Sequence, residues 1–494
     1  MADRSGWQSA LNIIYFNPDQ MRADFLACYG HPVAKTPNID RLAAGGVRFD
    51  ACHVQHTVCT PSRCSFMTGW HPHVRGHRTL WYPLQPDEPN TLKYLKQAGY
   101  ETHWIGKNDL LAAGCFPDSV SAFEYGAGSG PGAVLFKPDQ PGFYSFLYGP
   151  MQGDNADWNM VEKAIAFLRR RKPGDPPFML FLPVVFPHCP FTCPQPWYDM
   201  YDPDSLPPLR PADLEGKPAF HRLIRQYRRL NELDDAVFRK IRAVYLGMIS
   251  YVDAMLGRLL DALEETKLAD DTAVFFFSDH GEWAGDYGLV EKWQSGLDDC
   301  LTHVPMIVRT PGCAKGHVIR EPVECFDIMP TTLELAGVEC RHTHFARSMM
   351  PQLKGAAGDP DRAVFAEGGY DPNEPHCFEG SRALPYDIPP KPETIYYPKG
   401  LQQQEHPESS ARCTMIRTAS HKLIVRPGDV SELYDLAADP LELRNVFGKP
   451  EHDAVQRALE RRLLDWYVHT SDVVPFERQA RGFPPKGTPG HPAA

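Results

Sequence analysis

The chain has 494 residues, of which 43% are hydrophobic and 23% charged, and its formal net charge is −11. This length and composition are those of a globular protein of two or three domains. The acidic balance and the lack of Lys/Arg runs argue against nucleic acid as the main partner, because phosphate binding depends on clustered cations. A small anionic ester remains a candidate ligand, since a local cationic pocket can form within an acidic protein.

The N-terminal residues, MADRSGWQSALNIIYF, lack the basic region and long apolar stretch of a secretion signal. No segment has the run of roughly 18 consecutive apolar residues that is typical of a membrane span. Thirteen cysteines, an odd number without regular spacing, suit a reducing compartment better than a disulfide scaffold. We therefore expect a cytoplasmic protein without a membrane partner.

Apolar runs alternate with helical patterns from the beginning of the chain. The run 12–16 is followed by a helical pattern that opens at Thr36 and Pro37, and a long helix is predicted over 236–263. Further apolar runs cover 101–105, 178–186 and 272–277. Such continuous runs are typical of strands that are buried on both faces. The sequence therefore predicts an α/β fold with a large, mostly parallel mixed sheet flanked by helices.

Polar residues follow four of these apolar runs, namely Asp19, Lys107, His188 and the pair Asp279-His280. In an open α/β sheet, ligands bind beyond the carboxyl ends of the strands, so these side chains are expected to meet at one edge. The alternative is that each is a separate strand-end residue in solvent. Together they favour a site for an anion or a metal ion.

The stretch Cys59-Thr60-Pro61-Ser62-Arg63 fits the same edge. Thr, Pro and Ser favour a helix start, and the helical pattern stops at Gly69. Cys59 is thus predicted at a helix N-terminus, where free amides and the helix dipole favour an anion. It is either a nucleophile or a buried structural thiol. A thiolate that attacks sulfate or phosphate, however, forms an adduct that a second attack must break.

Several motifs, in order along the chain, carry a resemblance to a known family. Cys59 to Arg63, followed by Thr68-Gly69, resembles the C-x-P-S-R motif of the formylglycine-dependent sulfatases in the alkaline phosphatase superfamily. Other blocks that resemble the family are Asp19-Gln20, Thr36 to Leu42, Gly46 to Phe49, Gly106-Lys107, Pro187-His188, Ser278 to Gly281 with Lys292, Glu432 to Leu436 and Asp439 to Glu442. The resemblance covers nearly the whole chain and lies near arylsulfatases, choline sulfatases and phosphonate monoester hydrolases. It implies an alkaline phosphatase-like fold with a smaller C-terminal α+β domain that contains an antiparallel sheet.

The resemblance also implies how Cys59 acts. A separate formylglycine-generating enzyme would oxidise it to formylglycine (3-oxoalanine), whose hydrate carries two hydroxyls on one carbon. One hydroxyl attacks sulfur and expels the alcohol; the other then collapses to the aldehyde and expels sulfate. Arg63 would position this nucleophile and balance its developing negative charge.

A divalent metal ion is implied at Asp19, Asp279, His280 and an oxygen of the modified residue 59. Carboxylate-rich ligation favours Ca²⁺, while the imidazole also admits Mn²⁺ or Zn²⁺. Pro18 departs from the family pattern, because many sulfatases have the first aspartate of an Asp-Asp pair there. Gln20 or water is expected to fill that ligand position.

The remaining implied roles are cationic and acid/base. Lys107 and Lys292 would bind the sulfate oxygens, and His188 or Lys292 would protonate the departing alcohol. The alternatives are a surface position for Lys107 and a packed core position for His188. Asp109 stands where many relatives have a histidine that helps to break the sulfated intermediate. Either Asp109 or His77 is expected to be the base of that step.

Three regions are expected along the chain. They are a catalytic domain over 1–370, a long variable loop region over 371–412, and a C-terminal α+β subdomain with its tail over 413–494. Loops as long as the second region usually form lids, binding surfaces or subunit contacts. One hypothesis is that Tyr396 to Lys399 reach a neighbouring active site in a homo-oligomer. His71 and His73 are interpreted as exposed loop residues.

Three functions compete at this point. The first is hydrolysis of an aryl or small organic sulfate ester. The second is hydrolysis of a phosphonate monoester or phosphodiester by the same groups. The third is a non-catalytic binding protein with a decayed site, motivated by Pro18 and Asp109.

Overall fold

The computed structural model describes residues 11–380 and 391–475. At its centre lies an eight-stranded sheet with the strand order β10-β2-β9-β7-β1-β6-β4-β5. In that order the strands cover His317–Ile319, Val47–Phe49, Met306–Arg309, Thr272–Phe277, Asn12–Pro18, Phe178–Val184, Glu101–Ile105 and Ala122–Glu124. Neighbouring strands are parallel except that β9 runs antiparallel to β2 and β7. The predicted mostly parallel mixed sheet is thus confirmed.

The central strand β1 shows why this sheet is buried on both faces. Successive side chains of a strand point to opposite faces, so one apolar run supplies two cores. Ile14 and Phe16 pack into the core on one side, whereas Ile13 and Tyr15 pack into the core on the other. All four side chains are fully buried. The continuous apolar pattern therefore reflects burial on both faces.

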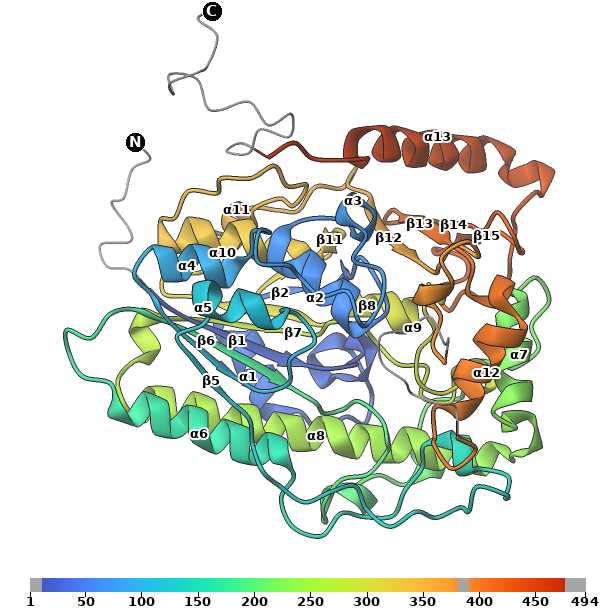
Figure 1. Ribbon diagram of the computed structural model, residues 1–494, viewed down its shortest axis with the longest axis horizontal. Coiled ribbons are helices and arrows are strands. Elements are labelled where there is room, and N and C mark those ends of the chain that lie inside the picture. The colour runs from blue at the N-terminus through green and yellow to red at the C-terminus, as the bar shows by residue number, and fades with distance from the viewer. Residues whose placement is uncertain (1–10, 381–390, 476–494) are drawn as a thin grey trace, which may run out of the picture.

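Helices cover both faces of the sheet (Figure 1). α1 (Pro37–Gly45), α6 (Ala156–Arg170) and α8 (Asp235–Glu265) contribute to one core, and α2 (Cys59–Thr68), α4 (Thr91–Gln97) and α10 (Ile328–Ala336) to the other. Short helices lie at α3 (Pro72–Arg75), α5 (Phe116–Ser119), α9 (Asp299–Thr302) and α11 (Met350–Leu353). By length and composition alone α8 is apolar enough to cross a membrane, yet 89% of its most apolar window is buried inside the protein.

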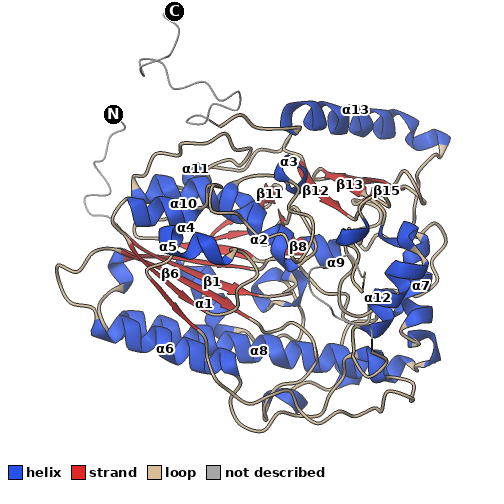
Figure 2. Ribbon diagram, in the orientation of Figure 1, coloured by secondary structure: helices blue, strands red, loops and turns tan. Residues whose placement is uncertain are grey.

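A second sheet lies beside the first and carries the C-terminal part of the chain (Figure 2). It is antiparallel, in the order β12 (Val364–Gly368), β13 (Cys413–Arg417), β14 (His421–Val425) and β15 (Glu432–Asp435). α13 (Asp453–Thr470) packs on it through Leu459, Leu463 and Trp466. β12 comes before residue 370, so this sheet takes one strand from the region assigned to the catalytic domain. A small sheet of β11 (Val323–Glu324), β3 (Cys52–His53) and β8 (His303–Val304) lies between the two.

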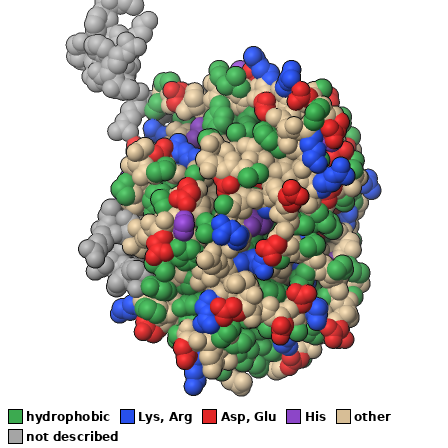
Figure 3. Space-filling view, turned by 90° about the vertical axis from the view of Figure 1, so that its right-hand side faces the viewer, with side chains coloured by type: hydrophobic (Ala, Val, Ile, Leu, Met, Phe, Trp, Pro, Cys, Tyr) green, Lys and Arg blue, Asp and Glu red, His purple; other side chains and the backbone are tan. Residues whose placement is uncertain are grey.

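The described part of the long variable region packs onto the body of the protein. Its helix α12 (Tyr397–Glu405) lies against α7 (Ala219–Tyr227). Figure 3 shows this side of the molecule, where acidic and basic side chains are interspersed. This face therefore has no large patch of side chains of one charge sign.

Candidate active site

The structure brings the predicted strand-end residues together. β7, β1, β6 and β4 are adjacent and parallel, so their carboxyl ends lie at one edge of the sheet. Asp19 follows β1, Lys107 follows β4, His188 follows β6, and Asp279 and His280 follow β7. These side chains therefore meet at one edge, as expected from the sequence, and the alternative of separate residues in solvent is wrong.

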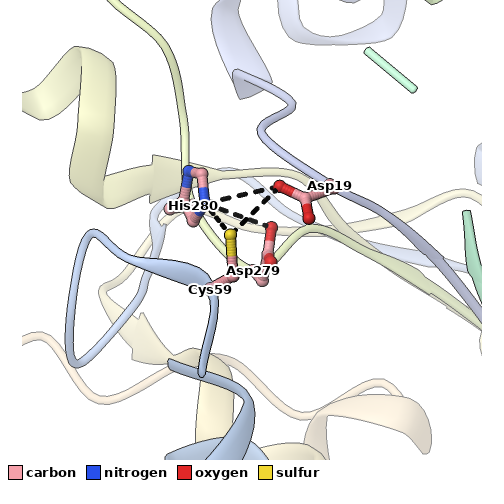
Figure 4. A group of neighbouring side chains, drawn as sticks. All are labelled: Asp19, Cys59, Asp279 and His280. Carbon is pink, nitrogen blue, oxygen red and sulfur yellow. Dashed lines mark hydrogen bonds and ion pairs between the residues drawn. The ribbon is translucent and has the colours of Figure 1, made fainter. Parts of the chain in front are cut away.

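Four side chains form a buried cluster with the character of a metal site (Figure 4). One ligand atom from each of Asp19, Cys59, Asp279 and His280 lies within 4.8 Å of the others, and all four residues are buried. The Cys59 Sγ lies 3.2 Å from His280 Nε2 and 3.6 Å from Asp19 Oδ1. The His280 Nδ1 donates to the backbone oxygen of Gly281 across 3.0 Å, which leaves the Nε2 lone pair directed at the cluster. Two carboxylates and an imidazole thus fit a hard or borderline divalent ion.

Arg63 connects the two carboxylates from within the helix that carries Cys59. Its Nε donates to Asp279 Oδ2 across 3.0 Å, and its Nη2 donates to Asp19 Oδ2 across 3.1 Å. All three side chains are completely buried. Burial alone would lower the pKa of the guanidinium, but the two carboxylates raise it above its usual value. Arg63 therefore balances the negative charge of the two carboxylates and fixes their orientation.

Cys59 is the first residue of α2, as the sequence predicts. The Ser62 hydroxyl donates to the backbone oxygen of Asp279 across 2.6 Å and holds the start of the helix at the end of β7. Burial, reinforced by the Asp19 charge, raises the pKa of the Cys59 thiol to about 12. The unmodified side chain is therefore a neutral thiol at physiological pH, and neutral thiols are weak nucleophiles and weak metal ligands.

Lys107 lies at the edge of the cluster and not on the surface. Its Nζ lies 2.8 Å from Asp19 Oδ2, 2.7 Å from Asp109 Oδ2 and 3.9 Å from Cys59 Sγ. Burial would lower the pKa of this ammonium, but the charges of Asp19 and Asp109 raise it well above its usual value. Lys107 is thus a fixed cation beside residue 59, and Asp109 forms an ion pair with it.

A second lysine of the site, Lys292, is buried and donates to two acceptors. Its Nζ lies 2.7 Å from Gln20 Oε1 and 2.6 Å from His188 Nε2. The His188 Nδ1 donates to the backbone oxygen of Cys189 across 2.6 Å. Burial and the neighbouring Lys292 charge hold the pKa of His188 well below its usual value. His188 is therefore a neutral acceptor, and the exchangeable proton of the pair is on Lys292.

Of the two alternatives for the missing ligand position, Gln20 or water, the first is wrong. The Gln20 side chain does not fill the missing ligand position, because its amide bonds Lys292 and Glu282. Only its backbone N–H turns to the cluster, donating to Asp279 Oδ1 across 3.0 Å. Gln20 has a φ of 68°, in the left-handed region, which the surrounding bonds must hold in place.

Glu282 was not anticipated, although it lies only two residues after His280. Its Oε2 accepts from the Gln20 side chain, and its Oε1 accepts from the backbone N–H of Ala284 and Glu291 at 2.9 and 2.5 Å. Burial raises its pKa to about 7. Glu282 thus connects the loop after β1 to the loop that carries Lys292. The available signal was the position of Glu282 directly after Ser278 to Gly281, but its bond to Gln20 joins residues 262 positions apart and could not be foreseen.

The structure also corrects the assignments of three histidines. His77 does not line the cavity at the cluster, because its ring nitrogens bond Glu88 and the backbone oxygen of Tyr82 at 3.1 and 2.9 Å. His71 is buried and accepts from Trp466 Nε1 across 3.0 Å, and His73 bonds Glu367 and Thr470. His71 and His73 therefore hold α13 and are not exposed loop residues.

A cavity of about 920 Å³ opens onto these groups. Cys59, Lys107, Asp109, His188 and Lys292 line it. From the variable region, it is also lined by Thr394, Tyr396, Tyr397, Lys399 and Gly400. Tyr396, Tyr397 and Lys399 line the cavity of their own chain, while the hypothesis that this stretch reaches a neighbouring active site in a homo-oligomer stays a prediction. The geometry is that of a deep anion-binding site with room for the group that carries the anion.

Comparison with known proteins then decides the family. Residues 11–338 match the family model described as Sulfatase, which is more than half of the chain. The chain belongs to the sulfatase family. Membership identifies it as a sulfuric ester hydrolase. Residues 392–469 match the model described as N-sulphoglucosamine sulphohydrolase, C-terminal.

Individual relatives within the family resemble the chain over most of its length. A sulfatase of Formosa agariphila is 29% identical over 407 residues, covering 76% of this chain and 79% of that protein. The multifunctional alkaline phosphatase superfamily protein PehA of Trinickia caryophylli is 27% identical over 530 residues, covering 93% of this chain and 96% of that protein. Among solved structures, a phosphonate monoester hydrolase from Silicibacter pomeroyi superposes with a TM-score of 0.72 at 25% identity. The match covers 94% of this chain and 96% of that structure's chain. The alkaline phosphatase-like fold is thereby confirmed.

Proposed function

We propose that the protein hydrolyses the sulfate ester of an aryl or small organic alcohol, with residue 59 converted to formylglycine as the nucleophile. One observation carries this proposal. The Cys59 thiol, whose pKa burial raises to about 12, lies at a helix start among two carboxylates, an imidazole and two lysines. A neutral thiol is a weak ligand for a metal ion and a weak nucleophile. An oxygen of a diol, in contrast, is a good ligand for a hard cation and can attack an anionic ester.

The donor set supports a divalent metal ion in the same place. Asp19, Asp279, His280 and an oxygen of the modified residue 59 would hold it, with Ca²⁺ favoured by the carboxylates and Mn²⁺ or Zn²⁺ admitted by the imidazole. Such an ion lowers the pKa of a bound hydroxyl and polarises an ester oxygen. The hydrated formylglycine supplies two hydroxyls on one carbon, one for attack at sulfur and one for release of sulfate.

The two lysines bind the sulfate group and move protons. Lys107 and Lys292 line the cavity together with residue 59 and stabilise negative charge that develops on the sulfate oxygens. Because His188 is neutral and accepts at Nε2, Lys292 Nζ holds the proton that the departing alcohol receives. His188 orients Lys292 through this bond.

Asp109 is proposed as the base that breaks the sulfated intermediate. With His77 bonded elsewhere, Asp109 is the carboxylate of the cavity that contacts Lys107 Nζ, at 2.7 Å, beside residue 59. Its carboxylate would take the proton of the second hydroxyl as sulfate leaves. Lys107 keeps this carboxylate directed toward the reacting centre.

A second candidate reaction is hydrolysis of a phosphonate monoester or phosphodiester by the same groups. The named similarity to a phosphonate monoester hydrolase and to the multifunctional PehA favours it. The test is kcat/KM on an aryl sulfate against kcat/KM on a phenylphosphonate monoester, with protein that carries the aldehyde. We expect the sulfate to be preferred; a strong preference for the phosphonate would reverse the order. No hydrolysis of either, with unmodified Cys59, would favour a non-catalytic binding protein.

We also propose a reducing cytoplasmic compartment, a maturation enzyme as partner, and a homo-oligomeric state. All thirteen cysteines lie in the described part of the chain and are free, which supports the first. The stretch from Cys59 to Arg63, which resembles the C-x-P-S-R motif of the formylglycine-dependent sulfatases, supports the second. Size-exclusion chromatography with light scattering tests the third.

A further inference from the structure

Glu291, a buried carboxylate beside the proposed proton donor Lys292, has no part in the proposed reaction. It lines the active-site cavity, and its Oε1 lies 3.7 Å from Lys292 Nζ. This distance exceeds that of an N–H···O hydrogen bond. Burial alone would raise the pKa of Glu291, but the charges of Lys399 and Arg228 hold it well below its usual range. A full negative charge therefore lies next to Lys292 without bonding it.

Two other cations hold this carboxylate. Lys399 Nζ donates to Glu291 Oε1 across 3.1 Å, and this is the oxygen that faces Lys292. Arg228 Nη2 donates to Oε2, the other oxygen, across 2.6 Å. Lys399 is itself buried and comes from α12 of the variable region, and its Nζ also lies 3.4 Å from Glu379. Both oxygens of Glu291 are thus engaged by cations other than Lys292.

The backbone of Glu291 is fixed close to Lys292. Its φ is 67°, in the left-handed region, and its N–H donates to Glu282 Oε1 across 2.5 Å. A shift of about 1 Å, which side-chain torsions can supply, would bring the carboxylate within hydrogen-bond distance of Lys292 Nζ. The bond to Lys399 therefore decides which of the two lysines the Glu291 Oε1 contacts.

The hydrogen bonds of Lys292 show why this choice matters. An ammonium group has three N–H donors. Gln20 and His188 accept from Lys292 at 2.7 and 2.6 Å, and among the described residues no hydrogen bond uses its third donor. A bond to Glu291 would occupy that donor and would make the ammonium a weaker acid, since a bonded carboxylate favours the charged form. The departing alcohol would then find neither a donor nor an easily released proton.

Resting on the proposed function, we propose that Lys399 is a positioning residue for Lys292. By bonding Glu291, Lys399 keeps this carboxylate away from the third N–H of Lys292, which is left for the ester oxygen of the departing alcohol. The proton then passes from Lys292 Nζ to that oxygen as the bond between sulfur and oxygen breaks. The variable region thus takes part in the reaction through α12, by a bond that does not involve the substrate.

The first test removes the charge of Lys399 and compares two leaving groups. In aldehyde-bearing Lys399→Met, kcat for 4-methylphenyl sulfate should fall at least about tenfold, because its alcohol needs a proton. For 4-nitrophenyl sulfate, whose alcohol departs without one, kcat should fall less than about threefold. Lys391→Met, an exposed lysine of the same region that does not line the cavity, is the control and should change neither. Equal losses on both esters, or a loss on neither, would overturn the inference.

The second test asks whether the loss comes from Glu291. Glu291→Gln keeps an oxygen for Arg228 but removes the charge that attracts Lys292. The double variant Lys399→Met/Glu291→Gln should therefore turn over 4-methylphenyl sulfate at least about fivefold faster than Lys399→Met alone, a non-additive effect of residues in contact. A residue that only supports packing would not be repaired by a second substitution. Losses that add in the double variant would contradict the inference.

Folding and the underlying reaction are checked separately. Thermal melting shows whether each variant is folded. Lys399→Gln, which is also neutral, takes the place of Lys399→Met if that variant does not fold, and the same outcomes are expected. Failure of the proposed function has its own signature, because aldehyde-bearing wild-type protein would then hydrolyse neither ester. Failure of the inference alone would leave the wild type active, with equal or additive losses in the variants.

Discussion

The ammonium of Lys292 donates to the imidazole Nε2 of His188 across 2.6 Å, while His188 donates through Nδ1 to a backbone oxygen. This geometry fixes the tautomer of the histidine and assigns the proton of the pair to the lysine. Either residue was a candidate for the acid from sequence alone. The structure favours Lys292 as donor and His188 as the group that positions it.

Lys292→Ala should therefore show a loss that depends on the leaving group. We expect kcat for an unactivated ester such as 4-methylphenyl sulfate to fall by about 10²–10⁴, and kcat for 4-nitrophenyl sulfate to fall much less, because its alcohol departs without a proton. Steady-state kinetics on both esters measures the difference. Lys315→Ala, an exposed lysine, is the control. Equal losses on both esters would show that Lys292 acts only in binding.

Asp109→Asn should stall the second half of the reaction. The first alcohol would be released in a burst, and a sulfated residue 59 would then accumulate, because the second hydroxyl keeps its proton. Rapid-quench kinetics and peptide mass spectrometry detect the burst and the adduct. Asp109→His, which replaces the carboxylate by another base, is expected to retain turnover. Full steady-state turnover by Asp109→Asn would reject this assignment.

A divalent ion should stabilise the folded protein through the buried cluster. An ion at 100 times its dissociation constant adds about 2.7 kcal/mol to the free energy of unfolding. The melting temperature of chelator-treated protein should therefore rise on addition of Ca²⁺, and this rise should disappear in Asp279→Asn. Asp472→Asn, an exposed carboxylate, should keep it. A rise of equal size in Asp279→Asn would place the ion elsewhere.

The docking of α13 should weaken in mild acid. Burial, with the neighbouring His73, holds the pKa of His71 well below its usual value, and the unprotonated Nε2 accepts from Trp466. Below about pH 6.5 the unfolded His71 binds a proton that the folded one does not, so stability falls by at most about 1.4 kcal/mol per pH unit, until the folded pKa is reached.

His71→Gln provides the check, because glutamine offers an acceptor to Trp466 but does not titrate. Denaturant unfolding at pH 7.5 and pH 5.5 should show a smaller loss of stability for this variant than for the wild type. The other buried histidines contribute equally to both proteins. Identical losses in the two proteins would contradict the role of His71.

The strands and the edge at which the site lies could be predicted from the sequence, because both patterns are local. Buried strands give continuous apolar runs, and the polar site residues directly follow those runs. The sequence predicted the position of Cys59 for the same reason. It did not predict that His71 is buried, since Trp466 is 395 residues away. The Gln20–Glu282 bond and the Trp81–His376 bond were missed likewise, because each joins segments whose contact depends on the folded chain.

The chemical state of residue 59 tests the central claim most directly. Active protein, purified from a host that has a formylglycine-generating enzyme, is digested, and the peptide containing residues 59–63 is examined by mass spectrometry. The account predicts an aldehyde or its hydrate at residue 59, in a fraction that scales with sulfatase activity across preparations. Full sulfatase activity in protein whose residue 59 is entirely unmodified cysteine would contradict it.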